Sequence, residues 1–429
     1  MARKMKDSGI EWIGEIPEKW EVSQLKYAIR WKSEKGCPDA PVLSLYRDFG
    51  VVPKDSRDDN HNVTSLDTSN YKVVDIGDLV INKMKAWQGS MAVSDYRGIV
   101  SPAYHVCSIT SNKVNKRYLH HLLRNPAYLP EYVRLSTGMR IGQWDLGFDD
   151  FKNIPFLIPP LDEQAKIADY LDNGCASLDA ILDKTRSSIE EYKKLKQSVI
   201  TQAVTKTIYD DFRNPSKFRK LRSLCDVLSK GTTPKDIETQ NDEFYCIRYL
   251  KSENIVSNQL NLNPTFFITA ETNNSLERSK LNSGDILFVI AGASIGKVAI
   301  TTSDFLPANT NQAVAFIRLS SSYQYATKYI WYFLQSDVVK QLIALSAVQS
   351  AQPNLSLEDL GAMRLPLPDQ MGCLKITDYL DAKCAKIDRL IAKKEQLVKE
   401  LESYKKSLIY EVVTGKEGGV NYGYNLIPP

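Results

Sequence analysis

The sequence repeats itself at an offset of 209 residues, and this duplication constrains the fold more than any single motif does. Residues 166–172 read KIADYLD and residues 375–381 read KITDYLD. Further along, KQSVITQAVT at 196–205 matches KKSLIYEVVT at 405–414 at the same offset. A chain of 429 residues is long enough for two or three domains. We therefore expect a duplicated architecture.

Each repeated segment predicts a long amphipathic helix, at 158–207 in the first copy and 368–416 in the second. Apolar residues recur there at spacings of three and four, which is typical of a coiled-coil stripe. The stripe residues are Leu171, Cys175, Leu178, Leu182, Ile189, Tyr192 and Val199 in the first copy, and Leu380, Cys384, Ile387, Ile391, Val398, Leu401 and Leu408 in the second.

Two copies of one stripe favour antiparallel pairing of the helices with each other, whereas packing of each helix on its own domain is the alternative. Lys196 and Lys405 fall within the stripe and are expected to weaken it locally, to fix its register or to face water. The start of the second helix has Asp369 and Gln370, whereas Glu163 and Gln164 of the first copy lead one to expect a Glu-Gln pair, so its capping is left open.

The segments outside the helices, 1–157 and 208–367, have diverged almost completely. Both are rich in short runs of Val, Ile, Tyr, Phe and Thr broken by Gly, Pro, Asn and Asp, which predicts a mostly β domain with some helices. A faint correspondence survives between GDLVINKM at 77–84 and GDILFVIA at 284–291. The expected fold class is α+β, with two such domains, two long antiparallel helices in a pseudo-twofold repeat and a loosely ordered tail at 417–429.

Composition limits the class of protein and its cellular location. No run approaches the roughly 20 apolar residues of a membrane helix, and the N-terminus lacks the apolar stretch of a signal peptide. The seven cysteines form no CxxC pair and the four histidines show no ligand spacing, so we expect reduced thiols, no metal site and a cytoplasmic location. A net charge of +4 does not by itself suggest nucleic acid.

The sequence resembles the specificity subunits of type I restriction-modification systems over nearly its whole length. The resemblance is carried by KDSGIEWIGEIPEKWEV at 6–22, by FLIPPLDEQAKIADYLD at 156–172 and by the second copy LPLPDQMGCLKITDYLD at 365–381. It implies that each diverged domain is a target-recognition domain reading one half of a split, asymmetric double-stranded DNA sequence. This chain would then be non-catalytic and serve defence against foreign DNA.

The same resemblance implies the partners and their cofactors. The helices would hold two modification subunits, which use S-adenosylmethionine to methylate adenine, and restriction subunits that use ATP and Mg²⁺ for cleavage would join them. No cofactor is expected in this chain, and the cell would be bacterial or archaeal. The alternatives are a structural coiled-coil adaptor that binds proteins and a self-sufficient DNA methyltransferase or nuclease.

Motifs for independent catalysis are incomplete. The string NPAY at 125–128 lacks the second proline of an adenine-holding motif, and we interpret it as a turn. GASIGK at 292–297 is one residue short of a phosphate-binding loop and has Val298 in place of Ser or Thr, so we expect a tight turn whose lysine faces phosphate. The carboxylates of Asp369 and Asp381 lie too far apart along one helix to share a metal ion.

Base edges are read by Arg, Lys, Asn and Gln, and phosphates are held by Lys, Ser, Thr and backbone amides. The candidate DNA contacts of the first domain lie in two polar loops: Lys83, Lys85, Trp87 and Gln88, and Arg140, Gln143 and Trp144. Those of the second domain lie in four: Lys230, Thr232 and Thr233, then Lys297, then Asn309, Asn311 and Gln312, and finally Gln349, Ser350 and Gln352. For each residue, an ordinary solvated loop position is the alternative.

Overall fold

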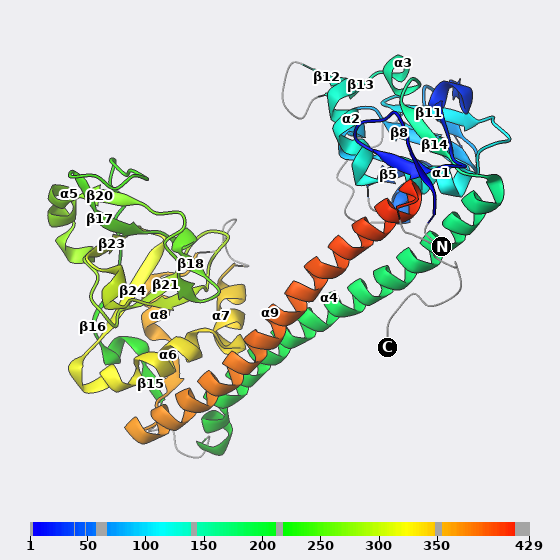
Figure 1. The fold of residues 1–429 in the computed structure, drawn as a ribbon. Helices are drawn as coiled ribbons and strands as arrows, with labels where there is room; N and C mark the ends of the chain where they lie inside the picture. Colours follow the sequence, from blue (N-terminus) through cyan, green and yellow to red (C-terminus); the bar gives the residue numbers. More distant parts are fainter. Residues whose placement is uncertain are drawn as a thin grey trace. The chain divides into compact units, whose positions relative to one another are not determined.

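The computed structural model describes residues 3–37, 39–47, 49–56, 67–138, 144–211, 218–347 and 354–416, without the side chains of 206–211 and 346–347. It divides into two compact units, the first formed by Met1–Thr185 with Gln396–Pro429 and the second by Arg186–Glu395. Each unit holds one mixed domain and one half of each long helix (Figure 1). The expected α+β class is confirmed, and the predicted tail at 417–429 lies outside the described residues.

The two long helices are α4, Leu161–Asp211, and α9, Gln370–Thr414, where 158–207 and 368–416 had been expected. Helix α4 follows two prolines and carries Asp162 and Glu163 in its first turn, where carboxylates suit the positive end of the helix dipole. Helix α9 is capped differently, because the Asp369 side chain accepts a hydrogen bond from the Gly372 amide at 2.7 Å. This contact answers the capping question that the sequence left open.

The helices lie antiparallel in both units. In the first unit, Leu171 and Leu178 of α4 share one core with Leu408 and Val412 of α9. In the second unit, Ile200 and Val204 of α4 share a core with Leu380 and Cys384 of α9. None of the fourteen predicted stripe residues is exposed, since eight are buried and six are partly buried. The paired arrangement therefore buries the same apolar stripe of both copies.

Both stripe lysines form ion pairs across the helix pair. The Lys405 ammonium contacts the Asp179 carboxylate at 2.6 and 2.7 Å in the first unit. The Lys196 ammonium contacts the Asp388 carboxylate at 2.7 and 2.8 Å in the second. Each stripe lysine therefore has a carboxylate partner on the other helix, as expected if it helps to set the register.

The first domain is built around a four-stranded antiparallel sheet in the order β4-β11-β8-β9. Its strands are β1 Met5–Asp7, β2 Glu15–Pro17, β3 Glu21–Gln24, β4 Ile29–Lys32, β5 Leu43–Tyr46, β6 Gly50–Pro53, β7 Lys72–Val74, β8 Asp78–Asn82, β9 Met91–Val93, β10 Gly98–Val100, β11 Tyr104–Ile109, β12 Ser136–Thr137, β13 Asp145–Leu146 and β14 Pro155–Ile158. Its short helices are α1 Lys116–Leu123, α2 Leu129–Leu135 and α3 Phe148–Phe151.

The second domain repeats this sheet, in the order β16-β24-β21-β22. Its strands are β15 Phe218–Lys220, β16 Cys225–Lys230, β17 Tyr245–Leu250, β18 Ile255–Val256, β19 Gln259–Leu260, β20 Phe267–Thr269, β21 Ile286–Val289, β22 Val298–Ile300, β23 Ala308–Thr310, β24 Val314–Leu319 and β25 Arg364–Pro366. Its helices are α5 Ala270–Ser275, α6 Thr327–Leu334, α7 Asp337–Ala347 and α8 Leu357–Ala362. The domains thus share a sheet that their sequences barely reveal.

The two Gly-Asp turns precede the central strands β8 and β21 and are built alike. Gly77 and Gly284 adopt positive φ angles of 89° and 86°, which glycine tolerates without strain. The following aspartates are buried and paired: Asp78 accepts from Lys32 at 2.9 Å, and Asp285 accepts from Arg318 at 2.7 and 2.9 Å. The faint sequence correspondence therefore marks a shared structural turn.

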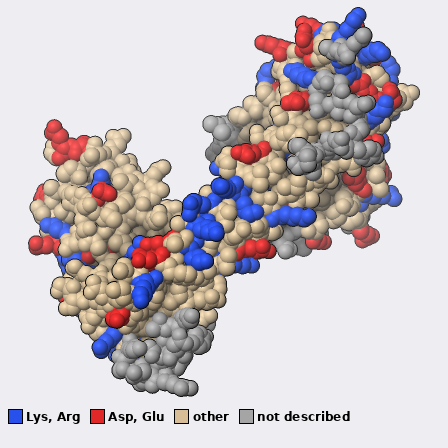
Figure 2. Space-filling model, turned by 60° about the horizontal axis from the view of Figure 1, so that its bottom comes forward, with Lys and Arg blue, Asp and Glu red and all other residues tan. Residues whose placement is uncertain are grey.

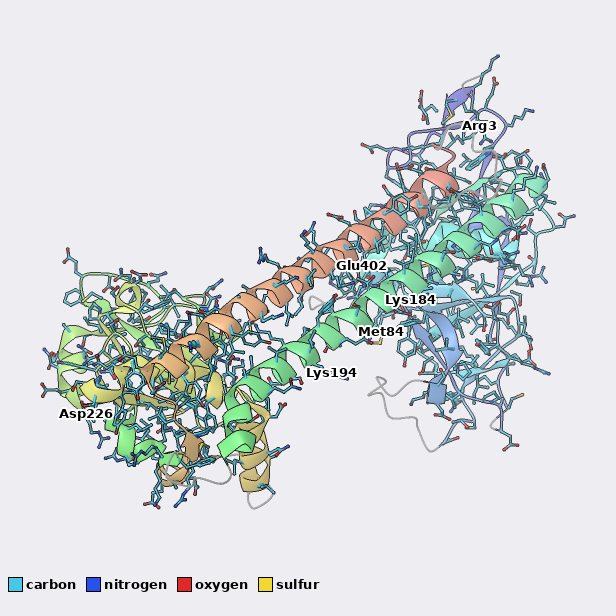
Figure 3. The ribbon with its side chains drawn as sticks, turned by 90° about the horizontal axis from the view of Figure 1, so that it is seen from below. Arg3, Met84, Lys184, Lys194, Asp226 and Glu402 are labelled. Atoms are coloured by element: carbon cyan, nitrogen blue, oxygen red, sulfur yellow. The ribbon has the colours of Figure 1, made fainter. Side chains whose placement is uncertain are left out.

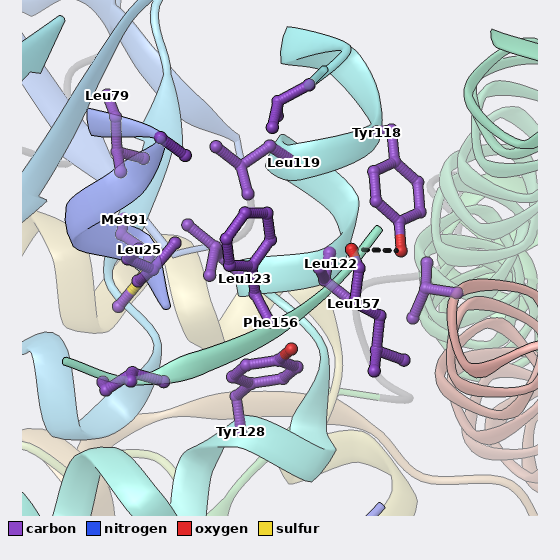
Figure 4. Close-up of a cluster of buried hydrophobic side chains, with 14 of the residues drawn as sticks. Leu25, Leu79, Met91, Tyr118, Leu119, Leu122, Leu123, Tyr128, Phe156 and Leu157 are labelled. Carbon is purple, nitrogen blue, oxygen red and sulfur yellow. Dashed lines mark hydrogen bonds between the residues drawn. The ribbon is translucent and has the colours of Figure 1, made fainter. Parts of the chain in front are cut away.

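Each domain packs on its own half of the helix pair through a continuous apolar core. In the first unit, Leu122 and Leu123 of α1 and Phe156 and Leu157 of β14 belong to this core, and the Tyr118 hydroxyl donates to the Leu157 carbonyl at 3.2 Å (Figure 4). The core continues to Leu171 of α4. Strand β14 pairs with β3 at the edge of the domain, and β25 pairs with β15 in the second unit.

Candidate nucleic-acid interface

The candidate residues of the first domain gather at one end of the sheet, where β8 ends and β9 begins. The loop from Lys83 to Gln88 contains a 3-10 turn, Ala86–Gln88, that lies against β13. The Leu146 amide donates to the Lys83 carbonyl at 3.0 Å, and the Trp87 and Trp144 rings meet edge to face with centroids 5.4 Å apart. Two loops that lie about 60 residues apart in the chain therefore form one surface.

The side chains of this surface remain available to a ligand. Lys85 and Gln88 are exposed, and both tryptophan rings are partly exposed. Lys83 is partly exposed and forms an ion pair with Asp145 at 3.4 Å. Arg140 and Gln143, predicted for the same surface, lie outside the described residues. The surface thus combines cationic, amide and aromatic groups, which are the types that contact phosphates and bases.

An aromatic cluster beside this surface had not been predicted. The Trp31 ring, at the end of β4, packs edge to face on His105 and Phe148, with centroids 5.0 and 4.7 Å away. The Lys72 ammonium lies 5.4 Å from the centre of the Trp31 ring. Burial, assisted by the charge of Lys83, lowers the pKa of Lys72. Trp31 is 42% exposed. Its position between two basic residues near the end of a strand is the one sequence signal that could have suggested a DNA contact.

The candidates of the second domain gather at the equivalent end of the second sheet. Lys230 ends β16, and the loop after it is held against the loop before β24, because the Thr232 amide donates to the Thr310 carbonyl at 3.1 Å. Gly231 permits this contact, since a Cβ there would lie 1.8 Å from the Thr310 carbonyl oxygen. Lys230, Thr232, Thr233 and Gln312 are exposed and Asn311 is partly exposed.

The turn before β22 completes this end of the sheet. Residues 292–297 form the tight turn that the sequence predicted. The Lys297 carbonyl closes the turn by accepting a hydrogen bond from the Val289 amide at 2.9 Å, and Lys297 is exposed. Ala291 pairs with Asn354, which follows the predicted residues Gln349, Ser350 and Gln352. These three lie outside the described residues.

One predicted contact is wrong in the structure. Asn309 lies in β23 and is fully buried, and its side-chain amide donates to Asn273 and to the Leu276 carbonyl, both at 3.2 Å. A buried amide with these partners cannot reach a ligand without unfolding its surroundings. The polar residue type had suggested a contact, whereas its role is to tie β23 to α5.

Other groups have structural partners. Asn125 of the NPAY string is buried and caps the following turn by accepting from the Ala127 amide at 2.8 Å. His121 contacts Asp172 at 2.6 Å, and His120 accepts from the Val93 amide at 3.3 Å. Within the described ranges, no three His, Cys, Asp or Glu side chains are placed to hold a metal ion, and no helix is long and apolar enough to cross a membrane.

Residues 17–191 and 214–400 match the family described as the type I restriction modification DNA specificity domain. The chain belongs to this family. Two copies of the domain account for most of the sequence, in agreement with the repeated sheet and helix of the two units. The resemblance noted in the sequence is confirmed, and the chain is a specificity subunit, the DNA-recognising rather than the catalytic component.

Curated relatives carry the same description. The specificity subunit is 24% identical over 428 residues to the MjaVIII specificity subunit of Methanocaldococcus jannaschii, covering 94% of this chain and 93% of the relative. It is 27% identical over 293 residues to the EcoBI specificity subunit of Escherichia coli, covering 61% of this chain and 58% of that relative.

Solved structures show the same fold. One structure comes from a study of complex assembly and conformational transition of the type I R-M system. It has a TM-score of 0.65 at 15% identity, and the match covers 93% of this chain and 99% of that chain. The HsdS subunit of Thermoanaerobacter tengcongensis has a TM-score of 0.50 at 16% identity and covers 93% of this chain and 98% of its own.

Proposed function

We propose that each domain of this specificity subunit reads one half of a split, asymmetric DNA site through the loops at one end of its four-stranded sheet. The observation that carries the proposal is the convergence of distant polar loops at the equivalent sheet end of both domains. The sheet order is the same in the two domains, whereas the residues on the loops differ. Two unlike surfaces on a repeated scaffold suit a target with two unlike halves.

The proposed reading surface of the first domain has a central aromatic pair. It comprises Lys83, Lys85, Trp87, Gln88 and Trp144, with Trp31 of the neighbouring cluster. Arg140 and Gln143, outside the described residues, remain proposed contacts of the same domain. Lysine and arginine would contact phosphates or guanine edges, and Gln88 and Gln143 would contact adenine edges. Exposed indole rings offer flat apolar faces that can pack on sugars or thymine methyl groups.

The proposed reading surface of the second domain is more polar. It comprises Lys230, Thr232, Thr233, Lys297, Asn311 and Gln312. Gln349, Ser350 and Gln352, outside the described residues, remain proposed contacts of the same domain. Asn309 is not part of this surface, because it is buried. The threonine hydroxyls and the lysines suit phosphate contacts, and the amides suit base edges.

The repeated helices offer two equivalent places for a partner. Leu195 of α4 and Tyr404 of α9 are 48% and 50% exposed, although both are large and apolar, and they are related by the 209-residue offset. Each directly precedes a lysine of the two ion pairs. We assign them as contact points for two copies of one modification subunit, with restriction subunits joining the complex in the bacterial or archaeal cytoplasm. S-adenosylmethionine, ATP and Mg²⁺ would belong to those partners.

The test is to co-express the chain with its cognate modification subunit and to map methylated adenines by single-molecule sequencing. A split motif of two unlike halves with a fixed gap is expected. Trp144→Ala should relax one half of the motif and leave the other half intact. The matched control is Tyr27→Ala, an aromatic that is 69% exposed before the opposite end of β4. A short continuous motif, or none, would exclude two reading domains.

A further inference from the structure

The charge on the helix pair differs between the two units, although the apolar stripe is repeated. In the second unit, residues 383–394 of α9 carry five basic and one acidic residue, and residues 186–196 of α4 carry four basic and two acidic residues. The repeat-equivalent segment 174–185 carries one basic and two acidic residues. The segment 395–405, which lies in the first unit except for Glu395, carries two basic and three acidic residues. These two segments of the second unit are therefore basic, and their repeat-equivalents are slightly acidic.

The basic side chains of α9 form a defined face. Lys386, Arg389 and Lys393 recur at spacings of three and four, so they lie on one side of the helix, opposite the stripe residues Ile387 and Ile391. All three are exposed. Lys and Arg side chains gather visibly along the helices in Figure 2, and Figure 3 marks Lys194 on α4. We call Lys386, Arg389 and Lys393 the basic helix face; Lys194 is not part of it, because it lies opposite the stripe of α4 and points away from α9.

The charges of this face are left unneutralised. Among the described residues, none of these three is paired with a carboxylate, whereas Lys193 of α4 pairs with Glu190 at 2.8 Å. The repeat-equivalents of Lys386 and Arg389 are Ser177 and Ala180, so neither pairing of the helices nor their fold requires a cation there. Lys393 is matched by Lys184, so the cations of the face that distinguish the second unit are Lys386 and Arg389. These two exposed, unpaired charges indicate a ligand that approaches only the second unit's half.

We propose that the basic helix face binds the phosphate backbone of duplex DNA, in addition to the two reading surfaces. This inference rests on the proposed function, since it supposes that DNA is already held by the domains. Phosphate contacts by lysine and arginine carry no sequence information but fix the position of a protein on the duplex. A lysine-rich surface without an apolar centre suits phosphates better than a protein, because protein interface cores are depleted in lysine.

The experiment replaces two of these residues with their repeat-equivalents, Lys386→Ser and Arg389→Ala, in the complex of the full chain with its modification subunit. Binding to a duplex of random sequence is followed by fluorescence anisotropy at NaCl concentrations between about 50 and 200 mM. Loss of two phosphate contacts should lower the slope of log affinity against log salt by about 1.8 and weaken binding on the order of tenfold. The split methylation motif should stay the same.

A transferred-charge variant is the matched control. Adding Ser177→Lys and Ala180→Arg to the double variant restores the net charge of the chain but places it on the first unit. The salt slope should remain low. A slope that returns to its original value would show that only net charge matters and would overturn the proposal.

Two further outcomes separate this inference from the proposed function. If the double variant keeps the original slope but loses restriction subunits from the complex, the face binds an acidic protein surface and the proposal is overturned. In both overturning cases the split motif would persist, so the proposed function would stand. If instead the unsubstituted complex methylates no split motif, the proposed function itself fails.

Discussion

The Lys405 ammonium lies 2.6 Å from a carboxylate oxygen of Asp179, and the 209-residue repeat reproduces this pair as Lys196 with Asp388. Each pair joins the two helices inside one unit. A lysine within an apolar stripe is unfavourable unless a carboxylate on the other helix pairs with its ammonium group. Only one register of the two helices brings that carboxylate close enough. The ion pairs thereby specify which antiparallel alignment the helices adopt.

Reversing one charge of such a pair should destabilise the first unit. Asp179→Lys places two cations together and should lower the free energy of unfolding by about 1 kcal/mol, a small effect because both groups are partly solvated. The exchange Asp179→Lys with Lys405→Asp should recover most of the loss. Urea unfolding of the four forms measures the coupling. An exchanged variant no more stable than the sum of its single substitutions would disprove the register role.

The buried carboxylate of the second Gly-Asp turn should depend on its arginine. Asp285 is 1% exposed, and Arg318→Met removes its cationic partner while leaving the charge buried. We expect a loss of about 3 kcal/mol in the free energy of unfolding. Adding Asp285→Asn should restore part of it, because the neutral amide no longer needs the cation. Calorimetry checks both steps, and an Arg318→Met protein of unchanged stability would contradict this account.

Acid should weaken the first unit through His120. Burial, and then the charge of Arg124, lowers the pKa of His120 to about 3. The folded state therefore keeps the imidazole neutral, whereas the unfolded state takes up a proton below pH 6.5. Stability is complete above pH 6.5 and should fall by about 2 kcal/mol by pH 5. His120→Gln should flatten this dependence between pH 7 and pH 5, and a slope equal to that of the parent protein would exclude His120 as its source.

Gly231 should be indispensable for the second reading surface. Any Cβ at this position would lie 1.8 Å from the Thr310 carbonyl oxygen, so Gly231→Ala must separate the two loops. We expect the methylation motif to lose its second half while the first half is kept. Thr233→Ala, at an exposed position two residues on, serves as control and should cause a smaller loss. Retention of both halves by the glycine variant would show that this loop does not read DNA.

The sequence predicted the helices and their pairing because a repeated stripe is a property of the chain alone. It could not assign Asp179 and Asp388 as the partners of the stripe lysines, although both pairs of residues obey the same offset. A heptad pattern describes one helix, whereas the ion pair depends on the relative shift of two.

The site was predictable in part. Polar loops after Gly-Asp strands were chosen by residue type, and the sheets then brought those loops to one end. Trp31 and Asn309 show where residue type fails. Trp31 is exposed next to Phe148 because β4 is an edge strand of the sheet, and Asn309 is buried because β23 pairs with β17. Neither pairing leaves a local signal in the sequence.

The pairing of β3 with β14 affects how the gene for this protein can evolve. In the first domain, β3 lies near the start of the domain and β14 at its end, and the two strands pair residue by residue from Glu21 with Ile158 to Gln24 with Pro155. β15 and β25 do the same for the second domain. Neighbouring strands lie about 5 Å apart, so everything between them can be exchanged as a cassette without stretching the chain. Recombination within the two short gene segments that encode these strands would then join the same helices to a domain of different DNA specificity in one event.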